Sequence, residues 1–304
     1  MQVFLTGATG HIGEFVLEAF IRAGHSVTAL VRDPSNAELV VARGAQPVLG
    51  DLATIESYVA AAEEAGAIVH LALDRSPRGS EIDDRVVVAL LDAAARRSVA
   101  HGSAAFVYTS VMGVLGHTAG PAAEDAAVDP TPMVAWRAAR EQMVIDAGRR
   151  GVRTAVVRPG IVYGGTRGVI ADLLKDAGNG LVRVIGDGSN HWPCVYARDL
   201  ADLYVRVSAN PDAAGIFHAN DEADERVDDI VESIARHARR RPDVRRMPLR
   251  EARAKMGSYA DVLALDQCVR SPRARALGWS PTLHSVAGNV ARLLEEFRTR
   301  LEAA

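Results

Sequence analysis

The chain has 304 residues, of which 48% are hydrophobic and 24% are charged, and this length suits one large domain or a nucleotide-binding domain with a smaller companion. A formal net charge of −3 gives no electrostatic reason to expect nucleic acid, and no apolar run reaches membrane-spanning length. The two cysteines, Cys194 and Cys268, stand far apart without metal-ligand spacing, so we expect no metal and a reduced, cytoplasmic protein.

The first thirteen residues read M-Q-V-F-L-T-G-A-T-G-H-I-G, a short apolar strand followed by a loop with three evenly spaced glycines. Gly7 permits a tight turn, Gly10 lets a diphosphate approach the main chain, and Gly13 lets the next helix pack closely on the strand. Main-chain N–H groups and the positive end of the helix dipole would then face the anion. A second strand about 20 residues later completes the βαβ unit that binds a dinucleotide.

The following elements alternate between strands and helices, with no internal repeat and no low-complexity linker. We expect strands at 3–5, 27–31, 47–49, 67–71, 104–109, 151–157, 182–185 and 216–220. We expect helices at 14–23, 55–65, 82–97, 169–177, 226–239 and 285–301, the last with one apolar face. This alternation predicts an α/β fold, a doubly wound parallel Rossmann sheet with helices on both faces.

The glycine spacing G-x-x-G-x-x-G after Thr6 resembles the short-chain dehydrogenase/reductase superfamily, in particular its extended or atypical members, the NAD-dependent epimerase/dehydratase-like proteins. Residues 158–164 (R-P-G-I-V-Y-G) are similar to the family's R-P-x-x-V-Y-G, and 271–281 are similar to its closing S-x-x-K-x-x-x-L-G-W-x-P. The resemblance runs from Met1 to about Phe297. It implies an NAD(P)-binding Rossmann domain over 1–163 with returning segments near 192–220, and a smaller C-terminal α/β substrate domain over 164–190 and 221–304.

Two positions bear on how the adenosine half of the coenzyme binds. Arg32 ends the second strand, where a guanidinium suits the 2′-phosphate of NADP; in the alternative, Arg32 faces solvent, Asp33 takes the ribose and the coenzyme is NAD. By the resemblance, Asp51 receives the adenine amino group, and its alternative role is to cap the following helix. The remaining coenzyme contacts that the resemblance implies are Gly7, Thr9, Gly10, His11, Ile12, Gly13, Leu52, Leu71, Ala72, Thr109, Arg140, Pro159, Gly160 and Ile161.

The catalytic pattern of the superfamily is altered in this chain. In the superfamily a Ser or Thr orients the carbonyl, and a Tyr four residues before a Lys supplies the proton. Counting back from Gly116 puts the hydroxyl position on Val111, so Ser110, one residue earlier, is the candidate. Trp136 takes the Tyr position and Arg140 the Lys position; an indole N–H cannot relay a proton, while a guanidinium can still hold ribose hydroxyls.

Replacement acids are sought among the histidines and tyrosines. Tyr163 and His191 are the leading candidates because they fall in segments expected near the substrate, and Trp136 and Tyr196 are further substrate contacts. Each residue also has an alternative role, in packing for the tyrosines and in loop polarity for the histidine. The other two candidates considered are Tyr108 and His117.

The leading function is therefore an NADP(H)-dependent oxidoreductase that interconverts a small carbonyl and an alcohol, with Ser110 and Tyr163 or His191 handling the oxygen. Two alternatives stay open. A non-catalytic dinucleotide-binding sensor would fit the loss of the Tyr and Lys, and an NAD-dependent nucleotide-sugar epimerase or dehydratase would need a proton shuttle that is missing at the expected place. Members of the superfamily often pair through the helices after strands four and five, so a homodimer is expected.

Overall fold

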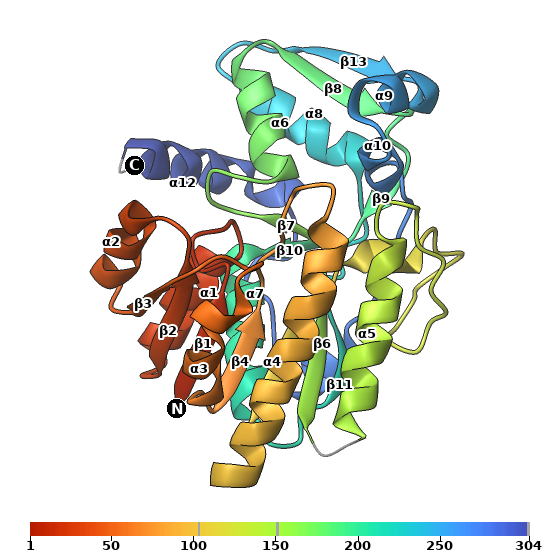
Figure 1. Ribbon diagram of the computed structural model, residues 1–304. Helices are drawn as coiled ribbons and strands as arrows, with labels where there is room; N and C mark the ends of the chain where they lie inside the picture. Colours follow the sequence, from red (N-terminus) through yellow and green to blue (C-terminus); the bar gives the residue numbers. More distant parts are fainter. Residues whose placement is uncertain (103, 150–151, 303–304) are drawn as a thin grey trace. The chain divides into compact units, whose positions relative to one another are not determined.

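The computed structural model describes residues 1–102, 104–149 and 152–302, which form two compact units (Figure 1). Unit 1 comprises Met1–Ser110, Ala139–Arg158 and Ala201–Phe217, and unit 2 comprises Val111–Ala138, Pro159–Leu200 and His218–Ala304. Compared with the predicted domains, this division assigns residues 111–138, 159–163, 192–200 and 218–220 to the second unit. No helix in the described part of the chain has the length and apolar character needed to cross a membrane.

A seven-stranded sheet, in the order β11-β6-β5-β4-β1-β2-β3, forms the centre of unit 1. Its strands are β1 (Gln2–Thr6), β2 (Ser26–Val31), β3 (Gln46–Leu49), β4 (Ala67–His70), β5 (Ala105–Thr109), β6 (Arg153–Pro159) and β11 (Gly215–Ala219). All neighbouring pairs from β3 to β6 are parallel, which confirms the predicted doubly wound Rossmann sheet. The sixth strand was predicted to begin at Gly151, which lies outside the described residues.

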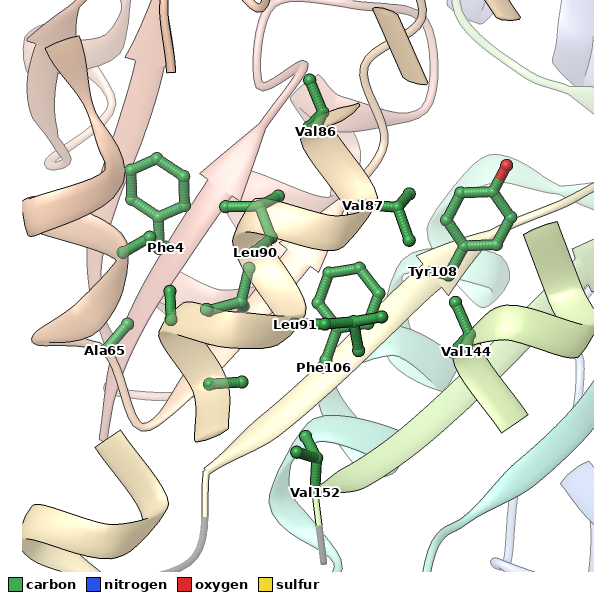
Figure 2. Close-up of a cluster of buried hydrophobic side chains, with 14 of the residues drawn as sticks. Phe4, Ala65, Val86, Val87, Leu90, Leu91, Phe106, Tyr108, Val144 and Val152 are labelled. Atoms are coloured by element: carbon green, nitrogen blue, oxygen red, sulfur yellow. The ribbon is translucent and has the colours of Figure 1, made fainter. Parts of the chain in front are cut away.

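Helices cover both faces of this sheet, and Figure 1 shows α4 and α5 on one face with α1 and α7 behind it. The helices of this region are α1 (Gly13–Arg22), α2 (Pro34–Ala42), α3 (Val59–Glu63), α4 (Gly79–His101), α5 (Ala135–Gly148) and α7 (Ala197–Ala209). On the α4 side, Phe4 and Phe106 from the strands pack with Val86, Leu90 and Val144 from the helices (Figure 2). The strands read as continuous apolar runs because both faces of the sheet are covered.

Two stretches between β2 and β4 differ from the sequence prediction. The expected helix at 55–65 is a short 3₁₀ turn, η1 (Ile55–Ser57), followed by α3. The break falls at Tyr58, which has a φ of −138°, is 1% exposed, stacks on Phe4 and donates its hydroxyl proton to the Leu52 carbonyl at 3.2 Å. Burial of this ring therefore interrupts the helix. The second difference is α2, which the apolar pattern did not predict.

Unit 2 is built from short elements around its own core. Its strands pair as β10 (Cys194–Tyr196) with β7 (Ile161–Tyr163), β12 (Glu225–Arg226) with β9 (His191–Trp192), and β13 (Asp243–Met247) with β8 (Leu181–Ile185). Its helices are η2 (Met112–Leu115), α6 (Val169–Gly178), α8 (Val227–His237), α9 (Leu249–Met256), α10 (Tyr259–Leu263), α11 (Pro272–Ala276), η3 (Ala287–Asn289) and α12 (Val290–Glu302). Apolar residues of α6, α8 and α12 form much of the core.

Candidate active site

The loop between β1 and α1 carries the three glycines. Gly7 has a φ of +76°, and the N–H of Gly10 donates to the Gly7 carbonyl at 2.9 Å, which closes a tight turn. A Cβ on Gly13 would lie 1.9 Å from the Gly7 carbonyl oxygen, and a Cβ on Gly7 would lie 2.8 Å from the Ala72 nitrogen. Side chains are excluded at these points, so the main chain at the start of α1 is open to an anion such as a diphosphate.

The loop follows β1, the strand at which the order of strands in the sheet reverses. From β1 the chain proceeds to β2 and β3 on one side and to β4, β5 and β6 on the other. In such sheets a ligand binds at the carboxyl ends of the strands, at the reversal point. Several other residues of unit 1 that were predicted to contact the coenzyme lie in the glycine loop, at the end of a strand or just beyond it: Thr9, His11, Ile12, Leu52, Leu71, Ala72 and Thr109.

Arg32 follows β2 and is exposed. Among the described residues it has no hydrogen-bond or ion-pair partner, whereas the neighbouring Asp33 accepts a hydrogen bond from Asn36 at 3.4 Å. Hydrogen bonds from Ser76 lower the pKa of Asp74, and the charge of Arg32 contributes to the same shift. Arg32 therefore places an uncommitted guanidinium at the end of β2.

Asp51 follows β3 and closes its own turn. Its Oδ1 accepts the N–H of Ala53 at 2.8 Å, and its N–H donates to Thr54 Oγ1 at 3.3 Å. Thr54 is the residue that precedes η1, so Asp51 is not the N-cap of that turn. Its contact with the adenine stays a prediction.

A buried polar network joins the ends of β1 and β4. The Thr6 hydroxyl accepts the N–H groups of Leu71 at 3.1 Å and Ala72 at 3.2 Å, and it lies 2.7 Å from Nδ1 of His70. Both lone pairs of the hydroxyl are then used, so Thr6 donates to Nδ1 and the ring proton of His70 is on Nε2. Nε2 lies 3.3 Å from Oδ1 of Asp83, and both side chains are almost fully buried. Every polar atom of the His70 ring is thus used within the protein.

The same network holds the side chain of Arg140, a residue of α5, against helix α4. Its Nη1 pairs with Asp84 at 2.5 Å, its Nη2 donates to the Ser80 carbonyl at 3.3 Å, and its Nε lies 3.6 Å from Asp83. The Tyr108 hydroxyl also donates to Asp83, at 3.0 Å. The guanidinium is therefore engaged by two carboxylates of α4. Its contact with the ribose and its part in catalysis stay predictions.

Two hydroxyl residues stand at the carboxyl end of β5. Thr109 Oγ1 lies 2.7 Å from the Tyr204 hydroxyl. Ser110 is 1% exposed, and its Oγ has no hydrogen-bond partner among the described residues. Leaving a buried hydroxyl unpaired costs about 1 to 3 kcal/mol. A bound ligand that accepts or donates a hydrogen bond to the Ser110 hydroxyl would remove this cost.

Pro193 packs against the segment that was predicted to contact the nicotinamide. A Cβ on Gly160 would lie 1.9 Å from the Pro193 carbonyl oxygen, and the N–H of Ile161 donates to the same oxygen at 2.7 Å. Pro159, which ends β6, is buried. Only glycine fits at position 160, because the main chains of the two segments are in contact there.

Trp136 lies near the start of α5 and is half-buried. The guanidinium of Arg137 lies 4.5 Å from the centre of its ring. A cation on this face uses the indole as a π surface, and the indole N–H remains a donor that does not titrate. Its predicted contact with substrate stays a prediction.

The two tyrosines predicted near the substrate are buried in the core of unit 2. Tyr163 is 0% exposed; its hydroxyl donates to Asp221 at 3.3 Å and lies 3.4 Å from the Leu283 carbonyl, and burial raises its pKa. The Tyr196 hydroxyl donates to Glu296 at 2.9 Å, and burial and that carboxylate raise its pKa. Both hydroxyls are committed inside the protein, so their positions do not favour proton transfer to a substrate.

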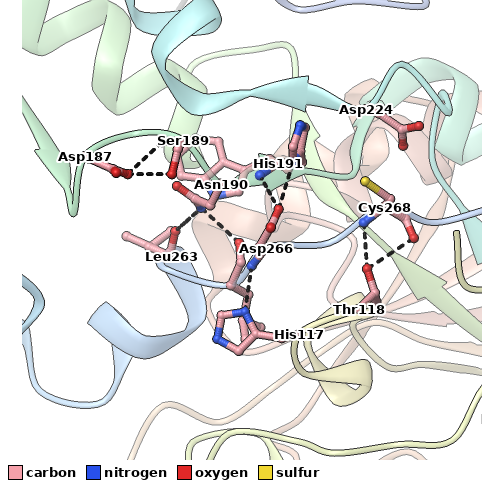
Figure 3. A network of polar contacts seen from close by, with 12 residues as sticks. His117, Thr118, Asp187, Ser189, Asn190, His191, Asp224, Leu263, Asp266 and Cys268 are labelled. Carbon is pink, nitrogen blue, oxygen red and sulfur yellow. Dashed lines mark hydrogen bonds and ion pairs between the residues drawn. The ribbon is translucent and has the colours of Figure 1, made fainter. Parts of the chain in front are cut away.

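His191 forms a pair with Asp266 (Figure 3). Oδ1 of Asp266 lies 2.8 Å from both the main-chain nitrogen and Nδ1 of His191. Partial burial alone would raise the pKa of Asp266, but the hydrogen bonds and electrostatic attraction of His191 outweigh it and lower the pKa. Because the ionised carboxylate only accepts, Nδ1 carries a proton and Nε2 is left for another partner.

The segment around Asp266 connects His191 to the loop that follows Ser110. The N–H of Gln267 donates to the His191 carbonyl at 3.0 Å, and its side-chain amide donates to Met112 and Gly116 carbonyls at 3.1 and 2.7 Å. A hollow of about 340 Å³ lies on this loop. It is lined mainly by small apolar residues: Leu115, His117, Thr118, Ala119, Gly120, Pro121, Ala122, Ala126 and Ala127.

Comparison with known proteins identifies the family. A model of the NAD dependent epimerase/dehydratase family matches residues 3–219, more than half of the chain. The chain belongs to this family. An uncharacterized protein of Schizosaccharomyces pombe is 28% identical over 300 residues, which cover 96% of this chain and 98% of that protein.

Two further similarities concern proteins whose names state an activity. The sterol-4-alpha-carboxylate 3-dehydrogenase (decarboxylating) of Dictyostelium discoideum is 25% identical over 234 residues, covering 72% of this chain and 71% of that protein. The UDP-glucose 4-epimerase of Thermus thermophilus, solved in complex with NAD, has a TM-score of 0.81 at 22% identity and covers 98% of this chain and 99% of its own. At that identity the second similarity shows the fold alone.

The residues of unit 1 fit the dinucleotide that the family binds. The glycine loop has no room for a Cβ at Gly7 or Gly13, and it stands at the reversal point of the sheet. Within the described ranges no group of His, Cys, Asp and Glu side chains has the arrangement of a metal site.

Sequence reasoning missed the partners that decide the chemistry of the histidines. Asp266 is separated from His191 by 75 residues, and no motif marks it. Asp83 is 13 residues from His70 and falls in an alanine-rich helix that gives no catalytic signal. Only the folded chain brings these pairs together.

Proposed function

We propose that this chain is an NADP(H)-dependent oxidoreductase that interconverts a small carbonyl compound and the corresponding alcohol. The observation that carries the proposal is the glycine loop at the reversal point of a Rossmann sheet, in a chain of the NAD-dependent epimerase/dehydratase family. The relative from Dictyostelium discoideum is a dehydrogenase by name, which supports redox chemistry.

The preference for NADP rests on Arg32. The guanidinium at the end of β2 is exposed and has no hydrogen-bond or ion-pair partner among the residues described. A 2′-phosphate would accept bidentate, charge-assisted hydrogen bonds from it. Asp33, the candidate for a ribose hydroxyl in the NAD alternative, already accepts from Asn36.

The chain contributes binding and orientation around the coenzyme, which when bound supplies the hydride chemistry. The glycine loop binds the diphosphate through main-chain N–H groups. Ser110 offers its hydroxyl, which lacks a partner among the described residues, as a hydrogen-bond donor that orients a carbonyl oxygen. Arg140 keeps its positive charge near Asp83 and Asp84, so it does not exchange protons.

A second candidate function is a dinucleotide-binding sensor without turnover. The observation that favours it is the engagement of Arg140 by α4 together with the burial of the Tyr163 hydroxyl, which leaves neither side chain in the usual catalytic role. Turnover separates the two candidates: an oxidoreductase consumes NADPH with some member of a broad carbonyl panel, and a sensor binds it without consuming it.

The proposal is tested by calorimetric titration of NADPH and NADH into the wild type and three variants. We expect the wild type to bind NADPH at least about tenfold more tightly than NADH, and Arg32→Asp to remove that preference. Arg22→Asp, at the opposite end of α1, is the matched control and keeps it. Gly10→Ala, whose Cβ would lie 3.2 Å from the Gly7 carbonyl oxygen, keeps the fold and weakens the binding of both coenzymes.

Absence of binding of either coenzyme to folded wild-type protein would refute both the oxidoreductase and the sensor. An unchanged preference in Arg32→Asp would remove only the assignment of the 2′-phosphate to this residue.

A further inference from the structure

We propose that the hollow on the loop 115–127 of unit 2 binds a small uncharged molecule with an apolar body and one hydrogen-bond acceptor, and that His117 donates a hydrogen bond to that acceptor. No comparison assigns this hollow a role. The inference concerns unit 2 alone and is independent of the proposed function, because it makes no use of the coenzyme. Its test is therefore a binding measurement on the coenzyme-free protein.

The walls of the hollow are mainly apolar. Its volume of about 340 Å³ is the space of about eleven water molecules at about 30 Å³ each, so it suits a ligand of roughly ten non-hydrogen atoms. Leu115, a wall residue, packs with Met112 and Val269 in a small buried cluster. The lining, formed by described residues, includes no aspartate, glutamate, lysine or arginine: Leu115, His117, Thr118, Ala119, Gly120, Pro121, Ala122, Ala126 and Ala127. Such a lining favours an apolar body.

The main chain around the hollow is fixed by hydrogen bonds to the segment 266–270. The N–H of Thr118 donates to the Asp266 carbonyl at 3.0 Å, and the N–H of Ala122 donates to the Cys268 carbonyl at 2.9 Å. The Thr118 hydroxyl accepts the N–H of Cys268 at 2.8 Å. These contacts form the hollow before any ligand arrives, so binding requires little ordering of the loop.

The start of the loop is fixed from two sides. The side-chain amide of Gln267, which is 4% exposed, donates to the Gly116 carbonyl at 2.7 Å. Gly116 has a φ of +65°, and a Cβ there would lie 2.1 Å from the Asp129 carbonyl oxygen. The segment before His117 therefore has little freedom to move, which holds the position of the histidine.

His117 supplies a hydrogen-bond donor to the hollow. Its Nδ1 accepts the main-chain N–H of Asp266 at 3.1 Å, so Nδ1 carries a lone pair and the proton of the neutral ring is on Nε2 (Figure 3). Among the described residues, Nε2 has no hydrogen-bond partner. Because His117 belongs to the lining, its Nε2–H is available to an acceptor on a bound molecule.

The other groups near the hollow disfavour a charged ligand. Residues 111–135 contain three carboxylates and no lysine or arginine, so an anion would lose its hydration without gaining a cationic partner from this segment. The Thr118 hydroxyl already serves the main chain of Cys268, which leaves His117 as the lining side chain with a hydrogen bond to offer, and that bond suits an acceptor. A neutral carbonyl or ether oxygen on an apolar body meets these conditions.

The experiment measures the binding of three molecules of similar size to the coenzyme-free protein. Acetophenone has an apolar ring and a carbonyl acceptor, ethylbenzene has the ring without an acceptor, and benzoate has the ring with a negative charge. Protein labelled with ¹³C in its alanine methyl groups is titrated with each molecule and followed by NMR. The signals of Ala119, Ala122, Ala126 and Ala127 are assigned by substituting each residue in turn.

Variants locate the site and identify the donor. Ala119→Leu and Ala127→Leu place larger side chains at two exposed positions of the lining, and Ala254→Leu, at an exposed position of α9 in the same unit, is the matched control. His117→Phe keeps a flat ring without the donor, and His117→Gln restores a side-chain N–H. Circular dichroism and thermal unfolding establish that each variant is folded.

We expect acetophenone to bind with a Kd on the order of 1 mM and to shift the four alanine signals of the lining. Ethylbenzene binds about threefold to tenfold more weakly because it lacks the hydrogen bond, and benzoate binds at least about tenfold more weakly. Ala119→Leu and Ala127→Leu each weaken acetophenone binding about fivefold or more, and Ala254→Leu does not. The preference for acetophenone over ethylbenzene disappears in His117→Phe and remains in His117→Gln.

Absence of acetophenone binding up to its solubility limit overturns the inference. Binding that leaves the four alanine signals unmoved, or that is unchanged in both leucine variants of the lining, overturns the location of the site. Equal binding of acetophenone and ethylbenzene to the wild type, or a preference that survives in His117→Phe, overturns the role of His117. Benzoate that binds as well as acetophenone overturns the class of ligand. Each of these outcomes leaves the proposed function standing, because NADPH is absent throughout.

Discussion

The protein contains two histidine–aspartate pairs of the same composition in opposite surroundings. In unit 1, His70 and Asp83 have side chains that are 1% and 4% exposed, and the ring donates from Nε2 to the carboxylate. In unit 2, His191 and Asp266 have side chains that are 31% and 50% exposed, and the ring lies against the carboxylate through Nδ1. The first pair has its ring nitrogens fully used by the protein, and the second leaves one available.

The difference shows that partners, more than residue types, decide what a histidine does. Thr6 satisfies the second nitrogen of His70 and joins it to the main chain after β4, so this pair holds together the ends of β1 and β4 beside the glycine loop. Among the residues that the structure describes, none satisfies Nε2 of His191 in the same way. The first pair therefore contributes to the stability of the fold, whereas the second leaves one ring nitrogen available outside the protein.

The largest expected effect is the difference in stability loss between removing Asp83 and removing Asp266. Asp83→Ala leaves the Nε2–H of His70 without its acceptor and removes a buried acceptor of the Tyr108 hydroxyl, so we expect the free energy of unfolding to fall by about 3 to 5 kcal/mol. Asp266→Ala removes an exposed pair, and we expect a change below about 1 kcal/mol. Urea denaturation followed by circular dichroism measures both; equal losses would contradict the division of roles.

Asp221, a buried carboxylate of unit 2 with a raised pKa, adds a second test of how burial changes the behaviour of an aspartate. Burial, with a smaller contribution from Glu225, raises the pKa of Asp221 to about 7. Between about pH 4 and 7 the folded chain keeps this proton while the unfolded chain releases it, so the group's contribution to stability falls as pH rises, by at most about 1.4 kcal/mol per pH unit.

Asp221→Asn should remove that contribution, because an amide does not titrate. The measurement is the difference in free energy of unfolding between wild type and Asp221→Asn at pH 4, 5.5 and 7. We expect the wild type to lose stability relative to the variant as pH rises. A difference that does not change over this range would show that Asp221 is ionised in the folded protein.

The glycine loop and the strands around it could be predicted from the sequence because their determinants are local, and the contacts of their residues with a coenzyme stay predictions. Gly7, Gly10 and Gly13 fall within one turn, and Arg32 and Asp51 follow their strands directly. A parallel sheet brings such strand ends to one edge. The alternation of apolar runs and helices was sufficient to predict the sheet itself.

The surroundings of the predicted catalytic residues could not be predicted, because they depend on contacts between residues far apart in the sequence. The sequence placed Arg140 by its spacing from Trp136, but Asp84 of another helix engages its guanidinium. Tyr163 was chosen for its motif, although the packing of unit 2 buries its ring completely. His191 was the other leading candidate, and it contacts Asp266, which lies 75 residues later in the sequence.

The central claim is that the two rings differ in availability, and chemical labelling tests it most directly. Native protein is treated briefly with diethyl pyrocarbonate, which modifies accessible unprotonated imidazole nitrogens, and the modified histidines are located by peptide mass spectrometry. We predict rapid modification of His191 and protection of His70 until the protein unfolds. Equal modification of both rings, or protection of His191 in the native protein, would contradict the account.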